Sequence, residues 1–166
     1  MKRLQQIWRH LWRGEREMRR AFGAAVRERI ATAVEAAERQ HRGELRVLVQ
    51  GGLGWRALGA VPDSRALALA HFARQGVWDT AENAGVLVYV LLAEHRVEIV
   101  ADRGIAARVP QTEWDAIVAR ALPLFAAGDA PAGLLRLLSE VGDLLATHFP
   151  ARGEHPNELP DAPILL

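Results

Sequence analysis

The chain of 166 residues contains no cysteine, and this absence excludes several kinds of chemistry at once. Disulfide bonds, a thiol nucleophile and thiolate zinc sites are all ruled out. Serine is scarce as well, since Ser64 and Ser139 are the only two, and neither lies in a nucleophile motif. Covalent catalysis therefore has few candidate residues in this sequence.

A strong net charge and a long apolar run are also missing. The formal net charge is +1, so we expect no general attraction to nucleic acid. No stretch approaches the roughly 20 apolar residues that are needed to span a bilayer. The first fifteen residues lack the apolar core and the small-residue cleavage site of a signal peptide. We therefore expect a soluble, cytoplasmic protein.

The composition that remains is that of an ordinary globular protein. Half of the residues are hydrophobic and a quarter are charged, and the length suits one domain with a two- or three-layer core. The patterns predict three segments: a basic amphipathic helix over residues 1–20, an α/β/α domain over 21–149 and an extended, proline-rich tail over 150–166. We expect the protein to be a monomer.

The stretch from Asp79 to Gly104 is the most informative part of the chain. Two β-rich runs, Gly85 to Leu92 and Arg96 to Ala101, are separated by a short polar link, which predicts a β-hairpin. The first run is apolar at every position, so both of its faces must be covered, as in a central strand beneath helices.

Helical and strand patterns surround this hairpin. Residues 44–50 alternate and predict the first strand, whereas residues 22–40, 63–76, 112–123 and 129–148 have the spacing of helices. Gly43 is expected to cap the first of these helices, Thr112 with Asp115 to form a capping box, and Pro123 to kink or end a helix. Helices on both sides of a mixed sheet that contains a central β-hairpin give a three-layer α/β/α sandwich.

The N-terminal segment is locally basic and carries an apolar stripe. Trp8 and Trp12 lie at helical spacing beside Arg9 and Arg13. One interpretation is that these four residues contact an anionic membrane surface or a protein partner, which would place the protein at the inner face of the membrane. The alternative is a terminal helix that packs its tryptophans onto the domain.

Several short sequence motifs together resemble those of one protein family. They are Gly43 to Val47, the run from Gly76 to Ile105, Thr112-Glu113-Trp114, and the closing Asn157 to Asp161. In the residues, order and spacing of these motifs, the chain resembles the TPM domain family over residues 22–161. The resemblance is strongest to the short, stand-alone bacterial members.

The resemblance implies an α/β/α sandwich and a restricted set of activities. Some plant members are described as acid phosphatases, and some members bind divalent cations in a shallow acidic cleft. Longer relatives have a secretion signal, a membrane anchor and an early aspartate that helps to build the cleft. Here a basic, tryptophan-containing segment stands in place of that beginning.

Three carboxylates are the candidates for a metal site, because clustered carboxylates hold Ca²⁺ or Mg²⁺. Asp102 ends the second strand of the hairpin, and Glu38 and Glu44 flank the turn into the first strand. In the alternative interpretation, Glu44 and Asp102 pair with Arg46 or Arg103, or cap loops. The sequence therefore favours a non-catalytic accessory or interaction domain, and the alternative function is a weak divalent-metal-dependent acid phosphatase.

Overall fold

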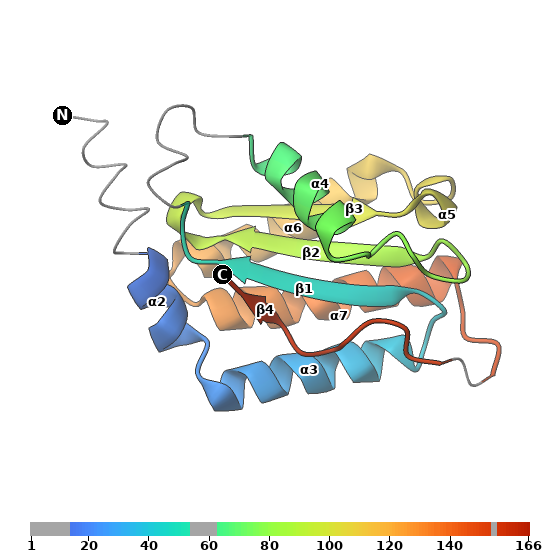
Figure 1. The fold of residues 1–166 in the computed structure, drawn as a ribbon, viewed down its shortest axis with the longest axis horizontal. Coiled ribbons are helices and arrows are strands. Elements are labelled where there is room, and N and C mark those ends of the chain that lie inside the picture. Colours follow the sequence, from blue (N-terminus) through green and yellow to red (C-terminus); the bar gives the residue numbers. More distant parts are fainter. Residues whose placement is uncertain (1–13, 54–62, 154–155) are drawn as a thin grey trace.

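The computed structural model describes residues 14–53, 63–153 and 156–166. In this part of the chain, helices precede, separate and follow the strands (Figure 1). The elements are α2 (Gly14–Ala21), α3 (Ala24–Glu38), β1 (Glu44–Gln50), α4 (Ser64–Arg74), β2 (Gly85–Leu91), the 3₁₀ turn η3 (Leu92–Glu94), β3 (Arg96–Ala101), α5 (Arg103–Ala106), α6 (Gln111–Ala126), α7 (Ala130–His148) and β4 (Ile164–Leu165).

These strands form one mixed sheet in the order β3-β2-β1-β4. Strand β1 is parallel to both β2 and β4, whereas β2 and β3 are antiparallel. The predicted hairpin is confirmed, and η3 makes its turn, with His95 in the left-handed region at φ 52°. A left-handed residue lets the chain reverse within a few positions, although none of the strong turn pairs is present.

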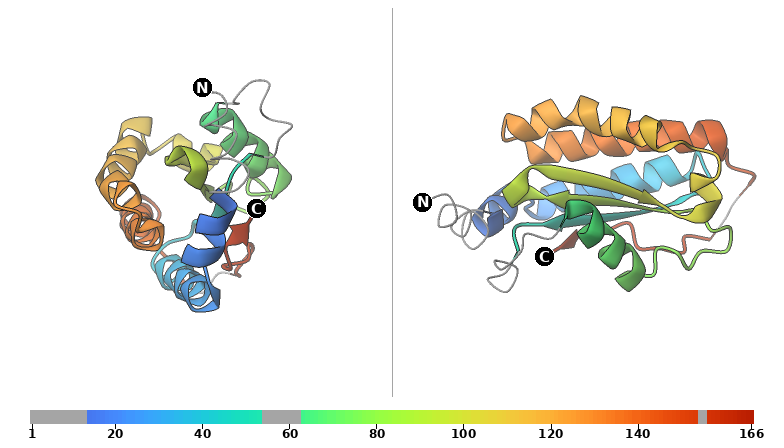
Figure 2. Two further views of the ribbon diagram at one scale, coloured as in Figure 1. Left: turned by 90° about the vertical axis from the view of Figure 1, so that its left-hand side faces the viewer. Right: turned by 90° about the horizontal axis from the view of Figure 1, so that it is seen from above.

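Alternate residues of β2 enter two separate cores, as the unbroken apolar run predicts. Val86, Val88 and Val90 face a large core with α3, α6 and α7. Leu87 and Tyr89 face a smaller core with α4. The side view shows α6 and α7 on one side of the sheet and α4 on the other (Figure 2). The three-layer sandwich is therefore confirmed.

Two expected helix caps were wrong, and α6 does not end at Pro123. Helix α3 ends at Glu38 with Arg39 as its cap, and Gly43 instead permits close packing against the carbonyl of Ala84. Helix α6 has Pro110 rather than Thr112 at its N-cap, and it continues past Pro123. Pro123 is exposed and lies three residues before the helix end, where the loss of a single backbone hydrogen bond is tolerated.

At the carboxyl end of β1, α2 crosses very close to the sheet. A Cβ atom at Gly14 would lie 1.8 Å from the carbonyl oxygen of Gly51, so the contact needs glycine. The C-terminal tail returns along the edge of β1 and ends as β4 (Figure 1). Among the described helices, none is long and apolar enough to cross a membrane.

Candidate functional site

Glu38, Glu44 and Asp102 all lie at the end of the sheet where β1 begins. Glu44 pairs with Gly85, and Val86 pairs with Ala101, so Asp102 falls on the other side of Gly85. The amide of Asp102 donates to the carbonyl of Gly85 at 2.8 Å. Across two strand spacings, the backbones of Glu44 and Asp102 are therefore about 10 Å apart.

The backbone of Val77 occupies the position above Gly85. A Cβ atom on Gly85 would lie 1.8 Å from the carbonyl oxygen of Val77. By strand alternation, Glu44 and Asp102 point to this same face, on either side of that position. The loop that enters β2 therefore stands between the two carboxylates, and they do not form one cluster.

Glu38 is a buried carboxyl group that accepts a hydrogen bond from the backbone of β1. Only 5% of the residue is exposed, and its Oε1 accepts a hydrogen bond from the amide of Leu45 at 2.6 Å. Burial raises the pKa of Glu38 to about 8 against the opposing effect of the Leu45 amide, and the charges of Glu44 and Asp161 raise it further. At neutral pH Glu38 is therefore mostly protonated, which suits a hydrogen-bonding role better than cation binding.

Glu44 holds the C-terminal tail. Its Oε2 accepts from the amides of Glu158 and Leu159 at 3.2 and 3.1 Å. The neighbouring Arg46 donates to the carbonyls of Pro160 and Ala162. A carboxylate and a guanidinium on one strand thus bind the backbone polar groups of the tail, which takes the place of a regular strand along this edge.

Asp102 caps the short helix α5. Its Oδ1 accepts from the amide of Arg103 at 2.7 Å, as the capping alternative predicted. Its Oδ2 is buried, and it has no hydrogen-bond partner in the part of the chain that the structure describes. Within residues 14–53, 63–153 and 156–166, no group of three acidic, histidine or cysteine side chains could hold a metal ion.

Sequence reasoning missed the partners that the tail supplies. Asp161 lies close enough to influence Glu38 and Arg46 electrostatically. The Asn157 to Asp161 motif was noticed in the sequence. Because it lies far along the chain from β1, the sequence could not show that the two segments are in contact. Trp8, Arg9, Trp12 and Arg13 lie outside the described residues, so the predicted N-terminal contacts stay predictions.

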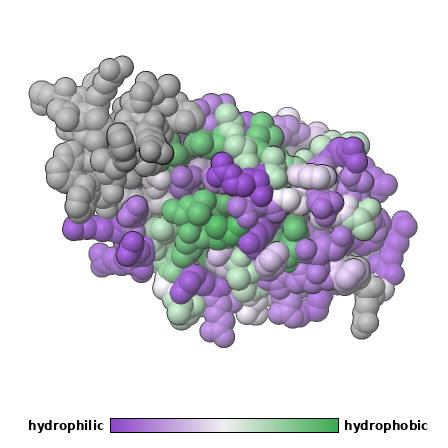
Figure 3. All heavy atoms as spheres, in the orientation of Figure 1, coloured by the Kyte–Doolittle hydropathy of each residue, from purple (hydrophilic) through white to green (hydrophobic). Residues whose placement is uncertain are grey.

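The outer face of α4 is a second feature that the sequence did not reveal. Its exposed positions include Ala66, Leu69, Ala70 and Ala73, and Trp78 follows in the next loop. Leu69 is 49% exposed and Trp78 is 53% exposed. We call these five residues the α4 apolar face. On the side of the molecule that carries α4 and β4, hydrophobic residues gather over both elements (Figure 3).

Comparisons with known proteins agree with this architecture. The fold is similar to the NMR structure of the BA42 protein from the psychrophilic bacterium Bizionia argentinensis, with a TM-score of 0.76 and 26% sequence identity. The match covers 87% of this chain and 94% of that one. No curated protein matches the sequence.

A family model that describes the TPM domain matches residues 18–144, which is most of the chain. This match spans β1, β2 and β3, the α4 apolar face and all three candidate carboxylates, whereas β4 lies beyond it. The chain therefore belongs to the TPM domain family.

Proposed function

We propose that this TPM domain is a non-catalytic accessory domain that associates with an anionic membrane surface. The observation that carries the proposal is the α4 apolar face. Helix α4 has the sheet on one side and solvent on the other, and the solvent side presents Leu69 and several alanines where a surface helix usually carries polar side chains, with Arg74 at its end. Exposed leucine and tryptophan side chains suit the boundary between water and lipid.

The charge distribution supports an anionic surface as the occupant. The first twenty residues contain seven basic side chains and two acidic ones, whereas the whole chain has a net charge of only +1. Arg16, Arg19 and Arg20 of this segment are exposed on α2. Each basic residue near an anionic leaflet contributes about 1 kcal/mol, so this segment and the α4 apolar face supply two separate attractions.

The positions of the three carboxylates favour a role without catalysis. Glu38 supports β1, Glu44 binds the tail and Asp102 caps α5. Each carboxyl group therefore has a structural task, and the backbone of Val77 lies between two of them.

Co-sedimentation with vesicles tests the proposal. We expect the full chain to pellet with vesicles of phosphatidylserine and phosphatidylcholine, and to stay in solution with phosphatidylcholine alone. The L69S/W78S variant should lose several-fold of this binding, because it removes the exposed apolar contacts. The matched control is L122S, which removes another exposed leucine, 37% exposed, from α6. Equal recovery of the wild type and L69S/W78S would contradict the proposal.

A weak divalent-metal-dependent acid phosphatase is the second candidate. One observation favours it, namely that the charges of Glu44 and Asp161 reach Glu38. The residues fit a cation poorly, however, because Glu38 is protonated at neutral pH and Glu44 is already bound to the tail amides. We derive no catalytic step from them.

A further inference from the structure

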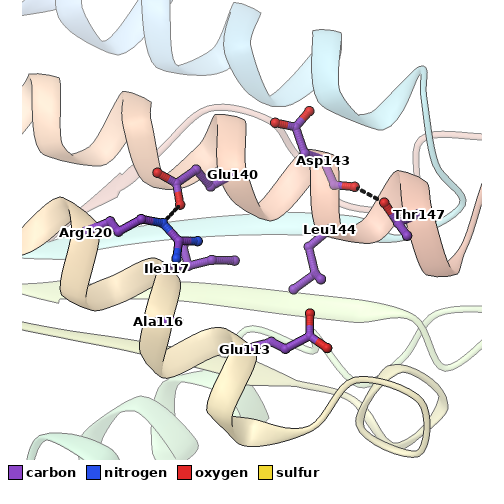
Figure 4. Close-up of a pocket in the computed structure, with 8 residues that line it drawn as sticks. All are labelled: Glu113, Ala116, Ile117, Arg120, Glu140, Asp143, Leu144 and Thr147. Atoms are coloured by element: carbon purple, nitrogen blue, oxygen red, sulfur yellow. Dashed lines mark hydrogen bonds and ion pairs between the residues drawn. The ribbon is translucent and has the colours of Figure 1, made fainter.

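Helices α6 and α7 enclose an open groove on the side of the sheet opposite to α4. The space has a volume of about 440 Å³, which is within the range of ligand pockets. Its apolar lining includes Ile117 of α6 and Leu144 of α7. Leu144 and Glu113 point into the space between the two helices from opposite sides (Figure 4).

The charges along this groove are not balanced. Glu140 is satisfied, because Arg120 donates to it at 2.6 Å and Arg136 donates at 2.9 Å. Partial burial alone would raise the pKa of Glu140, but these two arginines lower it below its ordinary value. Farther along the two helices, the carboxylate of Glu113 beside the groove and that of Asp143 on the far side of α7 have no ion-pair or hydrogen-bond partner among the described residues.

The two unpaired carboxylates frame an apolar surface. Glu113 lies between the helices, and the carboxylate of Asp143 lies on the side of α7 that points away from α6 (Figure 4). A helix that crosses α7 here could place basic side chains against both carboxylates and lay its apolar side chains over Leu144. This pattern of apolar anchors with flanking charges is the usual chemistry of a helix bound in a groove.

The geometry points to the α6–α7 groove as the docking site for a basic amphipathic helix of a partner protein. Charge complementarity selects this occupant, because an acidic or neutral helix would leave Glu113 and Asp143 unpaired at the interface. Helices α6 and α7, which line the groove, lie on the opposite side of the sheet from α4 (Figure 2). A domain held at a membrane by one side could therefore bind its partner with the other.

A synthetic helix-forming peptide of leucine and lysine is the probe for the test. Fluorescence anisotropy should show that the full chain binds it, and that the same peptide with glutamate in place of lysine does not bind. The E113K/D143K variant should bind the lysine peptide at least tenfold more weakly. The control E28K/D115K makes the same change in net charge at exposed positions outside the groove, and it should bind like the wild type.

A second variant and a second measurement keep the test decisive. E113Q/D143N removes the charges but keeps the side-chain size, so it should reproduce the loss if E113K/D143K does not fold. Peptide binding that survives in both groove variants, or that falls equally in the control, would overturn the proposal. So would salt-sensitive dimerisation of the wild type that E113K/D143K abolishes in analytical ultracentrifugation, because the occupant would then be a second copy of the chain.

Discussion

At the scale of single residues, the acidic side chains of this domain hold its backbone together. Glu38, Glu44 and Asp102 each accept hydrogen bonds from main-chain amides. Glu38 is the most unusual of them, because burial keeps its pKa near 8 and thus links folding to pH. The sequence identified these three as the notable carboxylates and offered a cap as one role for Asp102. It could not predict that Glu44 binds the tail, because Leu159 lies far from it along the chain.

Glu38→Gln should change how stability depends on pH. The folded state holds the Glu38 proton up to about pH 8, whereas the unfolded chain releases it near pH 4.5. The stability contribution of Glu38 is therefore complete below pH 4.5 and is lost as the pH rises to about 8. Urea denaturation should show that E38Q is more stable than the wild type at pH 8 by roughly 1–3 kcal/mol, with little gain at pH 5. E35Q, which alters an exposed glutamate on the same helix, should keep the wild-type pH dependence.

Gly85→Ala tests the close contact that separates Glu44 from Asp102. The added Cβ would lie 1.8 Å from the carbonyl oxygen of Val77, and backbone cannot move away cheaply. We expect a loss of about 3 kcal/mol in chemical denaturation. Gly23→Ala is the comparison, because a Cβ there meets no atom of the described residues within 4 Å, and its stability should stay within about 1 kcal/mol of the wild type. A tolerated G85A would show that the loop before β2 lies elsewhere.

At the scale of elements, the three longer strands were predictable, whereas β4 and the helix ends were not. Residues 44–50 and 96–101 formed the expected strands, because alternation and β-branched residues act locally. Helix α5 and strand β4 are too short to produce a periodic pattern, and both depend on contacts with distant residues. Periodicity predicted the helix that contains Leu69, but it could not show that half of this side chain stays exposed.

Glu44→Ala should loosen the tail without unfolding the domain. The substitution removes the acceptor of the amides of Glu158 and Leu159, so both amides should exchange with solvent at least tenfold faster. Hydrogen exchange followed by NMR measures this directly. E82A, which removes an exposed glutamate that pairs with Arg42, should leave the two amides protected. Unchanged exchange in E44A would mean that Arg46 alone is enough to hold the tail.

At the scale of the whole molecule, the two sides of the sheet are unequal. Helices α3, α6 and α7 cover one side, whereas α4 and the tail cover the other. The layers could be predicted from the apolar run of β2, but their unequal extent could not. It depends on the packing of helices whose individual patterns look similar. On the α4 side, apolar residues are exposed. On the other side, α6 and α7 form the groove beside Glu113.

Metal titration separates the two candidate functions at this scale. Ligand binding to a folded protein raises its melting temperature by mass action. We expect no shift with millimolar Ca²⁺ or Mg²⁺ at pH 7, because the candidate carboxylates do not converge. A concentration-dependent rise that E44Q and D102N both remove would support the metal-dependent phosphatase instead.

The most direct test of the membrane proposal uses the absence of cysteine, since one introduced cysteine can carry a single environment-sensitive fluorophore. The label is placed in L69C on the α4 apolar face or in L122C on α6, and the emission is recorded with anionic vesicles. We expect a blue shift and a rise in intensity for the label at position 69, and aqueous values for the label at position 122. Aqueous emission from both labels, or an equal shift in both, would contradict the membrane proposal.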